Sequence, residues 1–347
     1  MMYPKNIIYL IFILFFVQST KSQELKELFR SDEILEMTIS LPLKKVINDT
    51  KERNEHAAKL TYKLADSTVF VHHIEVQVRG KTRASREICS FPPLKLDFNK
   101  TDTKQTIFEG QNKLKLVTHC KSGKYYEEYY QKEYIVYKMY QKVSPYSFNV
   151  RLCHITYIDP DKPSQKISYY GFLLESIKDV AKRNDMKVFK DSVMNMQSIN
   201  KDNLDKLVMF QYLIGNLDWS IPTLHNIKLI VGKKGSLPLA VPYDFDYSGM
   251  VDTPYAIPAP QTNLTDVKSR LFLGFCSQDK YKSTINFFNS IRKELNDDIN
   301  TAGFLTEKTR KRMNSYLGVF YSYINDPKQV DKRITKACKV KHKHAYE

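Results

Sequence analysis

The chain has 347 residues, with 54 Lys and Arg side chains against 38 Asp and Glu, and its formal net charge is +16. The length suits two lobes better than a single core. The charge favours anionic partners, such as a nucleotide, a phosphorylated substrate, an acidic glycan or a membrane surface, although a basic surface without a partner has the same composition. Lysines are spread through the chain without a nucleic-acid-binding motif, so no nucleic-acid partner is expected.

The first residues have the pattern of a secretory signal. Lys5 precedes an apolar run from Ile7 to Val17, which is too short to span a bilayer comfortably. Thr20 and Ser22 are small residues with the spacing of a cleavage site, so residues 1–22 are predicted to be a signal peptide, with an uncleaved anchor as the alternative. No later segment has the length of a transmembrane helix. A secreted or periplasmic protein of the cell envelope is therefore expected.

Five cysteines are distributed along the chain, and none forms a C-x-x-C pair that would indicate a redox or zinc-ribbon site. Export permits disulfides, and an odd number leaves at least one thiol unpaired. The predicted pairs are Cys89 with Cys120 and Cys276 with Cys338. Cys153 lies in a strand-like run and is predicted to be a buried apolar side chain. Free thiols throughout are the alternative.

The N-terminal half is predicted to be mostly strands. A short helix over Phe29–Glu36 precedes a strand over Met37–Leu43, and a hairpin joins Thr61–Leu64 to Ser67–Gln77. His72 and His73 are adjacent in the second strand of this hairpin. They therefore point to opposite faces and do not suit a common metal.

A basic segment follows this hairpin. It contains Arg79, Lys81, Arg83 and Arg86 but only one glycine, Gly80. Any contact with phosphate would therefore depend on side-chain charge more than on backbone amides. An ordinary basic loop is the equal alternative.

A strand over Lys113–Val117 places Lys113 and Lys115 on one face. The following helix, Tyr125–Lys142, has a stripe of tyrosines with Glu133 in its middle. Burial of that carboxylate is costly unless it is paired.

Two antiparallel strands are then predicted over Asn149–Tyr157 and Ile167–Leu174. Glu175 follows the second strand and precedes a helical stretch.

The stretch from Phe210 to Gly249 has the clearest chemical pattern. An apolar helix ends at Gly215, and a polar loop carries Asp218 and Asn226. Strands over Ile227–Val231 and Leu237–Val241 form a hairpin, which brings Asn226 close to the residues after the second strand. If that strand continues, Asp244 and Asp246 share one face. Such oxygen ligands suit a hard cation such as magnesium, usually together with substrate phosphates.

Helices are predicted over Val267–Phe275, Thr284–Glu294 and Glu307–Asn325, followed by a Lys-rich tail over residues 332–347. The sequence lacks a Ser-His-Asp constellation, an H-E-x-x-H motif, a Walker loop and an internal repeat.

The order Asp218, His225-Asn226, strand, Tyr243-Asp244-Phe245-Asp246 resembles the active-site half of the atypical protein kinases that include the HipA-like and CotH-like kinases. The resemblance implies an α+β, two-lobed protein-kinase-like fold. Its β-rich N-terminal lobe would span residues 23–174 and its mostly helical C-terminal lobe residues 175–331. Two departures stand out: the interval from Asp218 to Asn226 is eight residues rather than the usual five, and Asp246 replaces the glycine that often follows the metal-binding Asp and Phe.

The resemblance also implies roles for individual residues. Asp218 would be the catalytic base, and the metal ligands would be Asn226, Asp244 and Asp246. Lys115, with Lys113 as the alternate, would hold the nucleotide phosphates and be fixed by Glu133; alternatively, Glu133 reaches only the edge of its helix. Glu175 falls at the hinge that would meet the adenine.

The sequence thus predicts an exported, kinase-like protein that uses ATP and Mg²⁺ to transfer a phosphoryl group to a hydroxyl substrate. The alternative is a catalytically inactive kinase-like fold that acts as a binding or structural module of the envelope.

Overall fold

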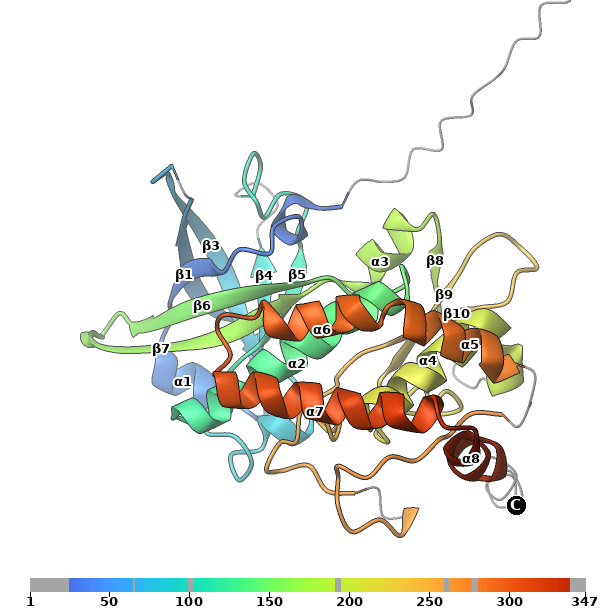
Figure 1. Cartoon of the computed structure of the whole chain (residues 1–347). Coiled ribbons are helices and arrows are strands. Elements are labelled where there is room, and N and C mark those ends of the chain that lie inside the picture. Colours follow the sequence, from blue (N-terminus) through green and yellow to red (C-terminus); the bar gives the residue numbers. More distant parts are fainter. Residues whose placement is uncertain are drawn as a thin grey trace, which may run out of the picture.

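A computed structural model of the chain describes residues 25–64, 66–98, 103–190, 195–258, 262–275 and 280–337. The predicted signal peptide, the predicted pair Cys276–Cys338 and most of the basic tail lie outside these residues. Within them, the fold is of the mixed α+β type, with a strand-rich part followed by a mostly helical part (Figure 1).

Seven of the described strands close into a barrel in the order β1-β2-β3-β4-β5-β7-β6. The barrel closes because β1 pairs in parallel with β6, whereas the other neighbours are antiparallel. Its strands are β1 Leu35–Ser40, β2 His56–Lys63, β3 Val69–Val78, β4 Leu94–Phe98, β5 Lys113–Val117, β6 Val150–Asp159 and β7 Lys162–Leu174.

Alternation of side chains fills the barrel. Leu114 and Leu116 of β5 are fully buried in the barrel core, and Lys113 and Lys115 lie on the other face, as predicted. The same alternation buries His72 of β3 and leaves its neighbour His73 exposed. The predicted β2–β3 and β6–β7 hairpins are confirmed, and Cys153 is a free, buried thiol.

The predicted helix over Phe29–Glu36 is wrong. The structure has a 3₁₀ turn, Glu27–Phe29, and then strand β1 from Leu35. Pairing of β1 with both β2 and β6 supplies backbone hydrogen bonds on its two edges, and this tertiary gain overrides local helix propensity. A short helix, α1 Leu43–Asn48, follows β1.

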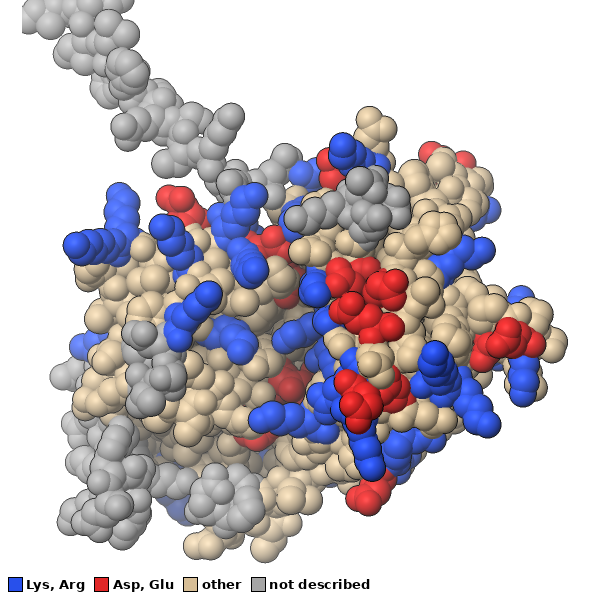
Figure 2. All heavy atoms as spheres, turned by 180° about the vertical axis from the view of Figure 1, so that it is seen from behind, with Lys and Arg blue, Asp and Glu red and all other residues tan. Residues whose placement is uncertain are grey.

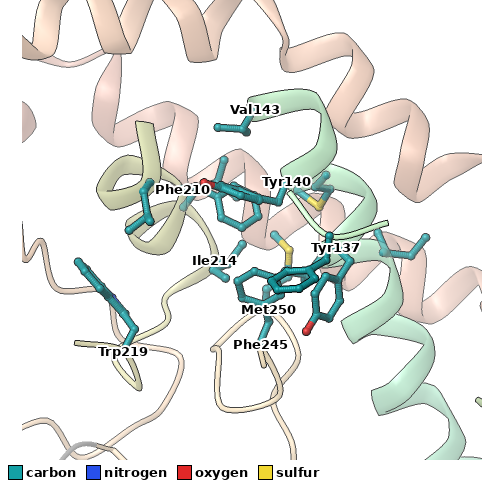
Figure 3. Close-up of a cluster of buried hydrophobic side chains, with 14 of the residues drawn as sticks. Tyr137, Tyr140, Val143, Phe210, Ile214, Trp219, Phe245 and Met250 are labelled. Atoms are coloured by element: carbon teal, nitrogen blue, oxygen red, sulfur yellow. The ribbon is translucent and has the colours of Figure 1, made fainter. Parts of the chain in front are cut away.

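Helix α2, Lys124–Val143, lies between the barrel and the later helices (Figure 1). Its tyrosines form the centre of the second core. Tyr140 packs on Phe210 with ring centroids 4.8 Å apart, and Tyr137 packs on Phe245 at 4.7 Å. Figure 3 shows these side chains meeting from three separate segments, which fixes α2 against the loop that carries the candidate site.

Helix α4, Lys201–Ile214, ends as predicted at Gly215, whose φ of +65° is left-handed. A β-carbon at Gly215 would meet the Tyr316 hydroxyl at 2.1 Å, so the turn also requires a residue without a side chain. A small antiparallel sheet follows in the order β10-β9-β8, with β8 Lys187–Phe189, β9 Ile227–Val231 and β10 Leu239–Pro242. The predicted β9–β10 hairpin is confirmed.

The remaining helices are α3 Ile177–Arg183, α5 Lys280–Ser290, α6 Arg292–Asn300, α7 Glu307–Ile324 and α8 Pro327–Val330, and a π-helical turn spans Asp331–Thr335. The predicted helix over Val267–Phe275 is wrong, since this segment is irregular. Phe272 is fully buried and packs edge-on against Tyr212 and Tyr281. The irregular segment places the Phe272 ring in the core without forming a helical turn.

Candidate functional site

Asp218 is held by two neighbours from its own loop. The Asn226 amide donates to the Asp218 carbonyl oxygen at 2.8 Å and to its carboxylate Oδ2 at 2.9 Å. His225 Nε2 lies 2.8 Å from the other carboxylate oxygen, Oδ1. Because the amide nitrogen of Asn226 faces Asp218, the Oδ1 atom of Asn226 remains available as a ligand oxygen. The structure therefore brings the predicted base and the predicted amide ligand together.

Residues 219–225 form a small closed loop between them. Ser220 and His225 exchange two backbone hydrogen bonds, of 3.0 and 2.9 Å. Leu224 and Asn226 have positive φ values of 50° and 52°. Such conformations are costly for residues with side chains and often mark functional loops. The longer interval between Asp218 and Asn226 is thus taken up by a folded loop.

Asp244 lies two residues after the end of β10. The Tyr243 N–H donates to the Asn226 carbonyl at 3.0 Å, so the hairpin places Asn226 beside Asp244 as predicted. Asp244 has a φ of 65°, and its N–H donates to the Tyr137 hydroxyl of α2 at 2.8 Å. Among the described residues, no hydrogen bond or salt bridge reaches the Asp244 carboxylate, which is half-buried.

The expectation that Asp244 and Asp246 share a strand face is wrong. Strand β10 ends at Pro242, and the left-handed backbone at Asp244 turns the chain. Asp246 is buried and accepts a hydrogen bond from the Tyr255 hydroxyl at 2.9 Å. It also lies 3.6 Å from the Arg83 guanidinium. Asp246 therefore points to a buried cation.

Three cations lie close to Tyr243 or Asp244. We call this group the Lys115 cluster (Arg79, Lys115, Lys228, Tyr243 and Asp244). The Lys115 and Lys228 ammonium groups lie over the Tyr243 ring, 4.9 and 5.5 Å from its centroid. Burial and the Arg79 charge lower the pKa of Lys115 to about 8, against the opposing effect of Asp244. Burial likewise lowers the pKa of Arg79, again opposed by Asp244. Within the described part of the chain, none of the three cations forms a salt bridge.

A second group, the Arg83 cluster (Arg83, Glu133, Asp246, Tyr130 and Tyr255), is buried. Arg83 lies 3.5 Å from Glu133 and 5.1 Å from the centre of the Tyr130 ring. Burial and the nearby Asp246 raise the pKa of Glu133 well above its usual range, although Arg83 opposes this. Burial and the Asp244 charge raise the pKa of Asp246 to about 6. The predicted Lys115–Glu133 pair is thus replaced by an Arg83–Glu133 pair.

The sequence reasoning missed Arg79 and Arg83 as individual site residues, although it noted the basic segment that contains them. The structure anchors this segment at several points. The predicted disulfide Cys89–Cys120 is present and ties it to the chain after β5. Nearby, the Phe91 N–H donates to the Cys120 carbonyl at 3.0 Å. The crosslink is of the type expected in an exported protein.

Glu175 lies at the end of β7 and is buried. Its carboxylate accepts from the backbone and side-chain amides of Asn149, both at 2.9 Å, and pairs with Arg183 at 3.1 Å. Burial raises its pKa, and Arg183 opposes that effect. Both carboxylate oxygens therefore have protein partners and connect the barrel to α3.

A pocket of about 500 Å³ opens beside Asp218. The small loop after Asp218 forms one wall, with Ser220, Thr223 and His225. Tyr247 and the segment near Asp266 form others. The pocket lies next to the catalytic candidate, and its lining contains no residue of the Lys115 cluster.

The donor set for a metal is incomplete. Among the described residues, no group of three or more His, Cys, Asp and Glu side chains could hold a metal ion. With Asp246 facing Arg83, the oxygens that remain are the Asn226 Oδ1 and the Asp244 carboxylate. Magnesium commonly uses one or two protein carboxylates together with phosphate oxygens and water. These two side chains therefore fit a magnesium ion that arrives with a phosphate ligand.

The face of the molecule in Figure 2 carries charges of both signs. On the face in Figure 2, Lys and Arg side chains are dispersed, and acidic side chains gather in a compact patch. Across the described ranges, no helix combines the length and apolarity needed to cross a bilayer.

No protein-family model matches the chain, and no curated protein matches its sequence.

Proposed function

We propose that the protein is an exported phosphotransferase with a two-lobed, kinase-like arrangement, in which the barrel forms one lobe and the later helices the other. It would use a nucleoside triphosphate such as ATP together with Mg²⁺. The observation that carries this proposal is the Lys115 cluster. Three half-buried cations lie close to Tyr243 or Asp244, and none has a salt-bridge partner in the described structure.

An uncompensated cation cluster is costly in a folded protein unless an anion completes it. Arg79 presents a planar fork that suits phosphate oxygens, and Lys115 and Lys228 supply point charges. A nucleotide polyphosphate fits this surplus of positive charge. Magnesium would neutralise phosphate charge and orient the transferred group.

Asp218 supports transfer to a hydroxyl acceptor. Its carboxylate lies at the mouth of the 500 Å³ pocket and is oriented by Asn226 and His225. A carboxylate has about four lone-pair sites, so these two contacts leave room for a third hydrogen bond. In the proposed reaction, Asp218 accepts the proton of the acceptor hydroxyl.

Replacement of Asp218 by Asn tests this assignment. Removal of a general base commonly costs about 10²–10⁴-fold in rate. We expect Asp218→Asn to lose that factor in phosphate release or transfer from γ-labelled ATP, while Mg-ATP still stabilises the protein against heat. Asp202→Asn is the matched control, because the Asp202 side chain is 79% exposed on α4 and pairs with Lys206 on the same helix. Full activity in Asp218→Asn would remove Asp218 from the reaction.

A second function, binding without catalysis, has two observations in its favour. The segment after β3 has a single glycine and no glycine-rich phosphate loop, and Asp246 faces Arg83 instead of a metal position. A ligand at about 100 times its dissociation constant stabilises a protein by about 2.7 kcal/mol. Stabilisation by Mg-ATP without any transfer in the wild-type protein would favour this alternative.

A further inference from the structure

The pocket beside Asp218 has a charge opposite to that of the chain. The whole sequence carries 54 Lys and Arg against 38 Asp and Glu. Yet no Lys or Arg lines this pocket in the described structure, whereas Asp218 and Asp266 do. A carboxylate or phosphate on the acceptor would meet two carboxylates, and the His225 imidazole of the same lining already faces Asp218 at 2.8 Å. Like charges at short range in a partly enclosed site repel strongly.

The uncharged part of the lining suits hydroxyl groups. Ser220, Thr223 and Tyr247 contribute hydroxyls, and Asp266 can accept through its free oxygen, since Oδ1 already accepts the Lys268 N–H at 2.9 Å. Ile257 and Pro258 add an apolar side, and the Ile257 side chain is 66% exposed. Hydroxyl donors and acceptors beside a small apolar surface match a compound with several hydroxyls on a carbon ring.

The size of the pocket limits the acceptor. A volume of about 500 Å³ lies in the usual range for small-molecule sites. The closed loop 219–225 forms one wall, and its backbone bridge between Ser220 and His225 keeps that wall in shape. The same loop lengthens the chain between Asp218 and Asn226, so the residues that separate the base from the amide also shape the acceptor site.

We propose that this pocket binds a small polyhydroxyl acceptor without negative charge, such as a neutral sugar or an amino sugar. The inference rests on the proposed phosphotransferase function and adds the class of acceptor. The charge of each substrate then determines where it binds. The anionic donor binds at the Lys115 cluster, and the neutral or cationic acceptor binds beside Asp218.

Trp219 provides a direct reporter of this binding. It is the only tryptophan in the chain, and it lines the pocket. Its indole N–H donates to the Asn216 carbonyl at 3.2 Å, which holds the ring in place. A change in tryptophan emission therefore reports on this pocket alone and needs neither nucleotide nor metal.

The test titrates the full chain with glucose, glucosamine and glucuronate, which share a ring but differ in charge. We expect saturable emission changes with glucose and glucosamine, with glucosamine bound at least as tightly as glucose. Glucuronate should bind at least about tenfold more weakly, because it meets Asp218 and Asp266. Calorimetry repeats each titration, so that binding without a change in emission is also detected.

Asp266→Asn sharpens the test, since asparagine keeps an oxygen for the Lys268 N–H but removes the charge. It should reduce the preference for glucosamine over glucuronate severalfold, whereas Asp202→Asn, on an exposed face of α4, should leave it unchanged. Glucuronate binding as tight as that of glucosamine would overturn the inference. The inference would also be overturned if neither glucose nor glucosamine bound.

Assays with labelled Mg-ATP separate this inference from the proposed function. Formation of labelled glucose or glucosamine phosphate supports both. Binding of these sugars without any transfer supports the pocket chemistry and contradicts the phosphotransferase. Hydrolysis of ATP by a protein that binds neither sugar, or transfer only to a serine peptide, contradicts the acceptor class and leaves the phosphotransferase standing.

Discussion

The Arg83 cluster and the Lys115 cluster use the same kinds of side chains with opposite balances. The Arg83 cluster has two carboxylates, Glu133 and Asp246, around one guanidinium. The Lys115 cluster contains three cations and the single carboxylate of Asp244. The first group is buried, and the second is half-buried. Each therefore carries a charge surplus that must be neutralised in a different way.

Burial decides how each surplus is neutralised. Burial raises the pKa values of Glu133 and Asp246, so the Arg83 cluster binds a proton more readily than free carboxyl groups do and needs no ion from solvent. The Lys115 cluster cannot lose its charge so easily, because Arg79 stays protonated and Lys115 still titrates near pH 8. An anion from solvent is the natural counter-charge. We therefore expect a structural role for the Arg83 cluster and, as proposed above, ligand binding at the Lys115 cluster.

The largest expected effect concerns the crosslink that supports both clusters. The disulfide Cys89–Cys120 anchors the segment carrying Arg79 and Arg83, and its ends are 31 residues apart. A loop of that length implies about 3–4 kcal/mol of stabilisation in the chain-entropy model. Cys89→Ala/Cys120→Ala should therefore lower the free energy of unfolding by about this amount, as measured by urea denaturation.

The control for this change is Cys153→Ala, which removes a buried sulfur without a crosslink. It should cost less than the double variant. Where the double variant remains folded, its affinity for Mg-ATP should fall more than that of Cys153→Ala, because both arginines lose their anchor. Equal stability of the two variants would show that the crosslink does not position this segment.

The next prediction separates the two clusters through Lys115. Lys115→Met should weaken binding of Mg-ATP by about 100-fold, since charge-assisted contacts contribute about 1.5–3 kcal/mol each. Without ligand the same change should leave the protein as stable as the wild type or slightly more stable at pH 7, because it relieves repulsion among three cations. Calorimetry measures the affinity, and thermal unfolding measures the stability.

Lys113→Met is a close control, because Lys113 lies on the same face of β5 but is exposed and paired with Asp97 at 2.8 Å. It should leave the affinity unchanged. In the wild type, affinity should also decline above about pH 8 as Lys115 loses its proton, and Lys115→Met should lose that dependence. Equal affinity in Lys115→Met and wild type would place the nucleotide elsewhere.

Local patterns predicted much of the framework that carries these clusters. The alternation in 113–117 placed Lys115 outside the barrel core, and the apolar run before Gly215 located the end of α4. The hairpin after Asn226 correctly brought Asn226 and Asp244 together. These features follow from periodicity and from turn chemistry over a few residues, so one sequence suffices to find them.

Contacts between segments that are distant in the sequence could not be predicted from such local patterns. The partner of Glu133 depends on how the segment after β3 folds over α2, and Arg83 sits there in a 3₁₀ turn with no periodic signal. The direction of Asp246 depends on the left-handed backbone at Asp244, which a non-glycine residue rarely adopts. The parallel pairing of β1 with β6 likewise joins segments more than a hundred residues apart.

The smallest predicted effect tests the proton in the Arg83 cluster. A carboxyl group whose pKa is raised in the folded state binds more protons there than in the unfolded chain. Its stabilisation is therefore present below the pKa of the unfolded carboxyl and is lost as the pH rises through the raised pKa, which is about 6 for Asp246. Glu133→Gln leaves one guanidinium facing one carboxylate, a balanced pair that needs no proton. The variant should therefore lose this pH dependence and be more stable than the wild type by about 1–2 kcal/mol at pH 7.5.

Urea denaturation at pH 4.5 and 7.5 measures this difference, and Glu307→Gln on the exposed face of α7 should keep the wild-type slope. If Glu133→Gln instead destabilises the protein at pH 7.5, Arg83 is stabilised by both carboxylates together. The buried group would then carry a net negative charge beside Asp244. In that case the protein itself would balance the surplus positive charge of the Lys115 cluster. The contrast between a structural Arg83 cluster and an anion-binding Lys115 cluster would then fail.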